Sequence, residues 1–369
     1  MKNKIPKALS LLSIFLLLPN IAKADWEATL KSAFPSAVVE VFDNDNDWHG
    51  TCAGDTGIGN YWGYGVGPKR TDGSNSPWTF YSCWNASQAT TPWIGTFGAG
   101  TSVGNTGKSL KLDTTNVVGP SRMGIYFGPG SNYNAGFSDL YVFERVKFNQ
   151  NGFPTDGTDT STSYTEGNAF TYYWAYNKLA AFNMGCAGPN GETQCAAGQS
   201  PYSPLHVIPH IMSYSYAPYN HQLALKVEIN EVAPAGGGAG MTETYGLDNG
   251  GKVVPRNAWI GIEWHAHNST IGGVKTCTVE VWLYDAAGVA TQIETAATGP
   301  FNIQPVNTLW NFIWLGGNES YTVGPTINNY YYVDDVIING SRIGPTYYSL
   351  LGAPSDTTAP APPTGLSLR

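Results

Sequence analysis

Apolar and polar residues alternate with a period of two along much of the chain, and Gly, Pro and Asn interrupt most windows long enough for a helix. Such alternation is typical of strands with one buried face, because successive side chains of a strand point to opposite sides. The pattern predicts strands at 37–42, 109–112, 123–127, 139–148, 169–176, 206–216, 222–229, 258–268, 277–284, 309–315 and 330–338. Many strands joined by turn-rich loops, notably 43–107 and the glycine run 236–238, indicate an all-β sandwich or barrel.

The N-terminal residues have the pattern of a secretory signal peptide. A lysine-rich start precedes an apolar run at 8–18, and Ala22-Lys23-Ala24 follows as a small-residue cleavage pattern. We therefore expect a signal peptide at 1–24 and a protein that is secreted or held at the cell surface. The apolar run is shorter than the ~20 residues of a membrane span, and we expect no such span elsewhere.

The remaining chain is predicted to form one domain at 25–348, because large β-sandwiches commonly exceed roughly 200 residues as single units. Beyond Ile343 the strand pattern fades, and prolines accumulate through 353–363. Proline keeps the backbone extended and opposes core formation. We therefore expect a Pro-rich tail or linker at 349–369.

Composition narrows the choice of partners. Charged residues make up 12% of the chain, aromatic residues 13%, and the net charge is -8. Nucleic acids and anionic membranes need a basic face, so neither is expected as the main partner. A polyanionic substrate would need a local basic patch to offset the overall charge. The oligomeric state is left open.

The chain has five cysteines, and in an exported protein these indicate disulfides. We expect bonds between Cys186 and Cys195 and between Cys52 and Cys83, each across a glycine-rich loop. Cys277 would then be unpaired and buried on a strand.

Three stretches carry a resemblance to a known family. They are the pair 259–268 and 278–285, the strand 141–148, and the late strand 330–338. They resemble strands of the concanavalin A-like lectin and glucanase superfamily, including its secreted polysaccharide lyases. The resemblance covers most of 109–344 and implies a jelly-roll β-sandwich of two antiparallel sheets. It also implies a protein directed at a polysaccharide.

The enzymes of this superfamily suggest two chemistries. Its retaining glucanases use an E-x-D-x-x-E strand, which this chain lacks, so that activity is disfavoured. Its lyases need a base beside the uronate carboxyl and a group that neutralises that carboxyl. The candidates here are His210 or His265 as base, Tyr214 as acid, and Arg145 with His267 as neutralising groups.

Alternation places Glu263, His265 and His267 on one strand face, and His210 with Tyr214 on a face of another strand. If these faces line the same sheet, they converge into a cleft with bases, acids and cations. The alternative is that each histidine is a hydrogen-bonded structural residue.

Aromatic residues favour a second function, a non-catalytic carbohydrate-binding or adhesion protein. Flat rings stack on the apolar faces of sugars. The predicted sugar contacts are Trp62, Trp78, Trp84, Trp93, Lys147 and Glu263. The alternating stripe Trp310, Phe312 and Trp314 is expected to belong to the core instead.

A calcium ion is also expected. The segment 43–47 reads Asp-Asn-Asp-Asn-Asp and concentrates the oxygen ligands that calcium prefers. The family resemblance implies a structural calcium that joins Asp43 to Asp334 or Asp335 of the closing strand. The alternative is a solvated turn rich in Asp and Asn.

Overall fold

The computed structural model describes residues 24–49, 60–61, 67–83, 93–96, 108–113, 121–127, 135–148, 174–184, 205–214, 223–232, 238–245, 254–271, 274–298, 309–317 and 330–352. The expected signal peptide, apart from its last residue, and the proline-rich segment from 353 onward lie outside these ranges. None of the described helices is long and apolar enough to cross a membrane.

Two antiparallel sheets contain all the described strands. Sheet 1 runs β16-β15-β14-β8-β18-β6-β5-β2, with β1 also paired to β18. Its strands are β1 (Val38–Glu40), β2 (Trp48–His49), β5 (Trp93–Thr96), β6 (Lys108–Asp113), β8 (Asp139–Phe148), β14 (Ile260–Ile271), β15 (Val274–Tyr284), β16 (Ala290–Thr298) and β18 (Tyr330–Asn339).

Sheet 2 runs β13-β12-β11-β10-β17-β7-β4-β3, with β9 also paired to β11. Its strands are β3 (Asn60–Tyr61), β4 (Phe80–Cys83), β7 (Ser121–Tyr126), β9 (Trp174–Lys178), β10 (Ala180–Met184), β11 (Leu205–Tyr214), β12 (Leu223–Val232), β13 (Gly238–Tyr245) and β17 (Phe312–Gly317).

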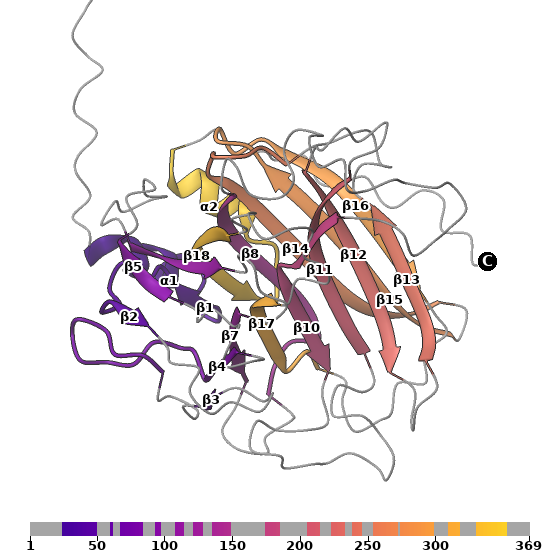
Figure 1. Cartoon of the computed structure of the whole chain (residues 1–369), viewed down its shortest axis with the longest axis horizontal. Helices are drawn as coiled ribbons and strands as arrows, with labels where there is room; N and C mark the ends of the chain where they lie inside the picture. The colour runs from indigo at the N-terminus through magenta and orange to yellow at the C-terminus, as the bar shows by residue number, and fades with distance from the viewer. Residues whose placement is uncertain are drawn as a thin grey trace, which may run out of the picture.

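The chain crosses repeatedly between the sheets, from β6 to β7, from β8 to β9, from β13 to β14 and through β17 to β18. Figure 1 shows the N-terminal strands at one end of the molecule beside α1, and the strands β11 to β16 at the other end. This winding of two antiparallel sheets is a jelly-roll sandwich. The predicted fold class is confirmed.

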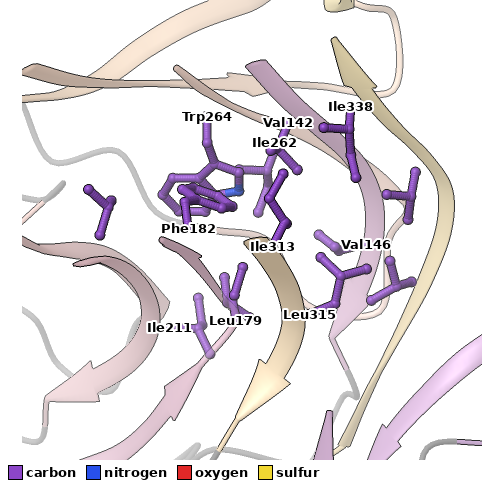
Figure 2. Packing of buried hydrophobic residues seen from close by; sticks show 14 of the residues in the cluster. Val142, Val146, Leu179, Phe182, Ile211, Ile262, Trp264, Ile313, Leu315 and Ile338 are labelled. Atoms are coloured by element: carbon purple, nitrogen blue, oxygen red, sulfur yellow. The ribbon is translucent and has the colours of Figure 1, made fainter. Parts of the chain in front are cut away.

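Alternate side chains of both sheets meet in one apolar core. Figure 2 shows Trp264, Ile262, Val142 and Ile338 of sheet 1 facing Phe182, Ile313 and Ile211 of sheet 2. Each fully buried side chain of this size contributes roughly 1.5–3 kcal/mol to folding. The predicted assignment of side chains in 259–268 to opposite strand faces is confirmed, because Ile262 and Trp264 enter the core while His265 and His267 do not. Cys277 is free and buried, also as predicted.

Two short helices were not foreseen. The first, α1 (Ala24–Ala33), packs Trp26 and Leu30, together with Phe34 just after its end, in a second cluster on the outer face of sheet 1. The second, α2 (Gly344–Leu350), buries Tyr347 and Tyr348 in that cluster. Ordered structure therefore continues past the expected start of the tail at 349. The expected loop at 236–238 also ends early, since β13 begins at Gly238.

Buried charges fasten the N-terminal segment. The Arg70 guanidinium binds Glu27 of α1 at 2.6 Å, Glu40 of β1 at 3.1 Å and Asp45 at 3.3 Å. Burial and the neighbouring Glu40 raise the pKa of Asp45 to about 9. One cation thus links the helix, the strand and the acidic segment that follows it.

Candidate functional site

The structure divides the predicted catalytic residues between opposite sides of the sandwich. His210 and Tyr214 lie on β11 of sheet 2, whereas Arg145, His265 and His267 lie on β8 and β14 of sheet 1. The strand neighbours of His210, Arg145, His265 and His267 fill the shared core, so His210 lies on one outer face and the other three lie on the opposite one. The expected convergence into one cleft does not occur.

His210 forms the chemically distinctive group on sheet 2. Its imidazole is buried, and its Nε2 lies 3.1 Å from Oε2 of Glu228 on β12. Across the strands His210 pairs with Lys178 of β9 on one side and with Lys226 of β12 on the other. If Nε2–H donates to Glu228, the basic lone pair of the ring is on Nδ1. This arrangement combines an imidazole oriented by a carboxylate with a lysine, Lys178, directly opposite it on the neighbouring strand.

Tyr214 lies at the end of the same pairing, opposite Trp174 of β9. The sequence pattern did not single out Lys178 or Glu228. Alternation along 222–229 could have placed Glu228 on the polar face of its strand, but only the pairing of β11 with β12 brings it to His210.

The aromatic stripe Trp310, Phe312 and Trp314 is buried, but only Trp310, which precedes β17, lies in the core as expected. Trp310 belongs to the central core, while Phe312 and Trp314 join Phe80 and Ile208 in a small cluster on the outer face of sheet 2. These rings support the strands that hold His210 and present little surface to solvent.

His265 and His267 form a compact polar group on the outer face of sheet 1. His265 Nδ1 lies 2.8 Å from Oε2 of Glu280, and its Nε2 contacts Oδ1 of Asp139. His267 Nδ1 lies 3.2 Å from the same Asp139 oxygen. Burial lowers the pKa of His265, but Glu280 and Asp139 outweigh it and hold the pKa above its ordinary value. A ring charged in this way is a poor proton acceptor.

Arg145 packs beneath α2. It is buried at 6% exposed, and its guanidinium carbon lies 5.6 Å from the centre of the Tyr348 ring. Its strand neighbour is Asp334 of β18. Arg145 is therefore enclosed by α2 and β18 and does not reach His210.

Two predicted sugar contacts, Trp93 and Lys147, lie in one row across sheet 1. The register joins Trp93 of β5 to Lys111 of β6, Lys111 to Tyr332 of β18, and Tyr332 to Lys147 of β8. Trp93 is 43% exposed, the largest value for a described tryptophan. We call these four residues the Trp93 row. It alternates aromatic rings with cations on a chain of net negative charge.

The other predicted sugar contacts differ. Trp78 is 1% exposed and stacks on Phe42 with ring centres 6.0 Å apart, so its faces are not open to a ligand. Trp62 and Trp84 lie outside the described residues.

Glu263 is fully buried and fastens α2 to sheet 1. Its carboxylate accepts hydrogen bonds from the Tyr284 hydroxyl at 2.5 Å, from the Ile343 amide at 2.5 Å and from the Gly344 amide at 3.3 Å. These amides belong to the start of α2, where backbone N–H groups have no partner within the helix. The predicted contact between Glu263 and sugar does not fit this position.

The acidic residues expected to hold calcium have unequal environments. The carboxylate of Asp335 accepts hydrogen bonds from Trp26 at 3.2 Å and from Tyr347 at 2.5 Å, so both oxygens already have donors. Asp334 is buried, and its Oδ2 has no hydrogen-bond partner among the described residues. Burial, together with Asp335 and Asp43, raises its pKa well above the ordinary value. Asp43 and Asp334 therefore fit a cation better than Asp335 does.

No family model and no curated protein matches the chain. Among solved structures, alginate lyase Aly36B bound to an alginate trisaccharide matches with a TM-score of 0.39 and 12% identity, over 84% of this chain and 100% of that one. Alginate lyase vAL-1 from Chlorella virus matches with a TM-score of 0.36 and 11% identity, over 67% of this chain and 88% of that one. The binding domain of botulinum neurotoxin serotype D matches with a TM-score of 0.34 and 8% identity, over 84% of this chain and 52% of that one. Likenesses this distant do not identify functional residues.

The role of Glu263 can be tested by Glu263→Gln. The amide NH₂ would replace one carboxylate oxygen and face either the Ile343 N–H or the Gly344 N–H and the Tyr284 hydroxyl, so we expect a loss of about 2–3 kcal/mol of unfolding free energy. Urea unfolding would measure it. Asp47→Asn is the control, because the Asp47 side chain is 71% exposed and should change stability little. Equal stability of the two variants would contradict the fastening role.

Proposed function

We propose that this chain is an exported protein that acts on an acidic polysaccharide and cleaves it by β-elimination on the outer face of sheet 2. The observation that supports this most is the buried His210 held by Glu228 at 3.1 Å, with Lys178 directly across the strands. A protein of net charge -8 needs such local cations to attract a uronate polymer.

Each residue of the group has a role in elimination. The base must remove the proton beside the uronate carboxyl, and Glu228 holds the His210 ring that would accept it. Because the His210 side chain is 0% exposed, this role requires that the bound polymer displace what covers the ring. A cation must stabilise the negative charge that develops on the carboxyl, and Lys178 is the described candidate. Tyr214, further along β11, would protonate the departing sugar oxygen. His265 is less suited to act as base, because carboxylates contact both of its nitrogens.

A second candidate function is glycan binding without cleavage, and the Trp93 row favours it. The exposed Trp93 ring can stack on a sugar, and Lys111 and Lys147 can pair with carboxylates along the polymer. The row lies on sheet 1, away from His210, so binding there and elimination on sheet 2 are separable.

Calcium is part of the same proposal. An ion bound by Asp43 and Asp334 would neutralise two buried carboxylates whose mutual repulsion opposes folding.

If the protein catalyses elimination, it should release an unsaturated sugar product. The test is to incubate the protein with alginate, pectate, glucuronan and glycosaminoglycans and to follow the ultraviolet absorbance of that product. His210→Ala should reduce the rate by roughly 10²-fold or more, because general base catalysis is lost. His265→Ala should retain activity, since it lies on the other outer face. If His210→Ala does not fold, Lys178→Met at a half-buried position is the alternative variant. It tests whether the lysine cation is needed for the elimination rate.

Activity lost in His265→Ala and kept in His210→Ala would place the base on sheet 1. Absence of product with every polymer from a folded protein would exclude the lyase.

Binding by the Trp93 row predicts retention in affinity gels that contain the polymer. Trp93→Ala should weaken binding about tenfold, which corresponds to about 1.4 kcal/mol. Lys111→Met with Lys147→Met should remove most of the dependence on salt, because charge pairs at a surface are screened by ions. Lys69→Met, an exposed lysine outside the row, is the control. Unchanged retention in both row variants would exclude this surface.

The calcium proposal predicts that added Ca²⁺ raises the melting temperature of the chelator-treated protein, because the ion binds the folded state preferentially. Asp334→Asn should remove this shift, while Asp72→Asn, at an exposed position outside the 43–47 segment, should preserve it. A shift of equal size in both variants would place any calcium elsewhere.

A further inference from the structure

Three side chains on the outer face of sheet 1 bring potential metal ligands together. They are Asp139 of β8 and His265 and His267 of β14, and one ligand atom from each lies within 4.8 Å of the other two. Among the described residues, no other set of three or more His, Cys, Asp or Glu side chains meets that criterion. The two histidines share a strand face because they are two positions apart, and the register places Asp139 directly opposite His267.

His265 is oriented by groups on three sides. Its Nδ1 lies 2.8 Å from Glu280 of β15, and Gln292 donates to the other Glu280 oxygen at 3.3 Å. The ring of Tyr141 stacks on the imidazole with centres 4.0 Å apart and planes 6° apart. This fixes the direction of Nε2, which points at Asp139.

The contact between Glu280 and His265 Nδ1 is the one that a metal-binding histidine typically makes with a supporting carboxylate. In such sites one ring nitrogen donates to a carboxylate while the other coordinates the ion. Here Glu280 takes the Nδ1–H, so Nε2 becomes a ligand once its proton is released. Both nitrogens of His265 face carboxylates, Nδ1 that of Glu280 and Nε2 that of Asp139.

The site is open on its solvent side. The side chain of His267 is 39% exposed and that of Asp139 41%, whereas His265 at 12% lies deeper. Three protein ligands and an open side leave room for a water or another ligand. Two imidazole nitrogens with one carboxylate suit zinc and related transition metals, whereas calcium prefers oxygen ligands alone.

We propose that Asp139, His265 and His267 bind one divalent transition-metal ion of the zinc class, with Glu280 positioning His265. Binding would release the Nε2 proton of His265 and replace its contact with Asp139 by bonds from both side chains to the metal. This proposal does not depend on the polysaccharide site, because His210 lies on the opposite outer face.

The test is calorimetric titration of the full chain, purified without a histidine tag and stripped with chelator, using Zn²⁺ alone. We expect one equivalent to bind, and Co²⁺ in its place to give the visible absorption of a site with nitrogen and oxygen ligands. His267→Ala and Asp139→Asn, both at partly exposed positions, should bind at least roughly 100-fold more weakly while unfolding at nearly the same temperature.

Two further variants separate the roles. Glu280→Gln should weaken binding by roughly 10–100-fold without changing the stoichiometry, because it orients a ligand but does not coordinate. Asp47→Asn, at an exposed carboxylate outside the site, should bind normally. A chain that takes up no zinc, or uptake unaffected by His267→Ala and Asp139→Asn, would overturn the proposal and leave a network of ion pairs that fastens β8, β14 and β15.

Discussion

The apolar contact between the two sheets is the interaction on which the rest of this protein depends. Every strand of the sandwich gives alternate side chains to it, as Ile262 and Trp264 do on β14. The residues between them must then face outward, because a strand reverses its side-chain direction at each step. Two outer faces result, separated by a full thickness of core. Groups on one face cannot act together with groups on the other.

Sheet 1 uses much of its outer face to hold helices. Glu263, Arg145 and Asp335 are buried there, and each contacts α2 through a charge, a hydrogen bond or a ring. Burying a charge is unfavourable unless donors or counter-charges surround it, and the start of α2 supplies backbone donors for Glu263. Residues predicted from the sequence as a catalytic group, a sugar contact and a calcium ligand therefore serve to attach a helix that the sequence analysis did not predict.

The polar groups that remain fall into three regions with different chemistry. His210, Glu228 and Lys178 on sheet 2 combine an oriented base with a cation. The Trp93 row at one end of sheet 1 alternates rings and lysines, while the group around His265 offers nitrogen and oxygen ligands to solvent. The net charge of -8 makes the lysines of the first two regions significant, because only local cations can attract an acidic polymer to such a chain.

The sequence by itself predicted many of the strands and the faces of many of their residues. It did not predict β13 or β16, and β2 to β5 lie within the expected loop 43–107. Strand β8 lies at the predicted 139–148, and Trp264 and His265 lie on the predicted opposite faces. It could not determine which strands share a sheet, because alternation is a local signal and the pairing of β14 with β8 joins residues more than a hundred positions apart. Only the tertiary structure placed His210 and His265 on opposite sides of the sandwich. The same long-range pairing brought Glu280 and Asp139 to His265, and the packing of α2 gave Glu263 its donors. A residue's side of its strand follows from its position in the chain, but its neighbours follow from how distant strands bury their apolar faces together.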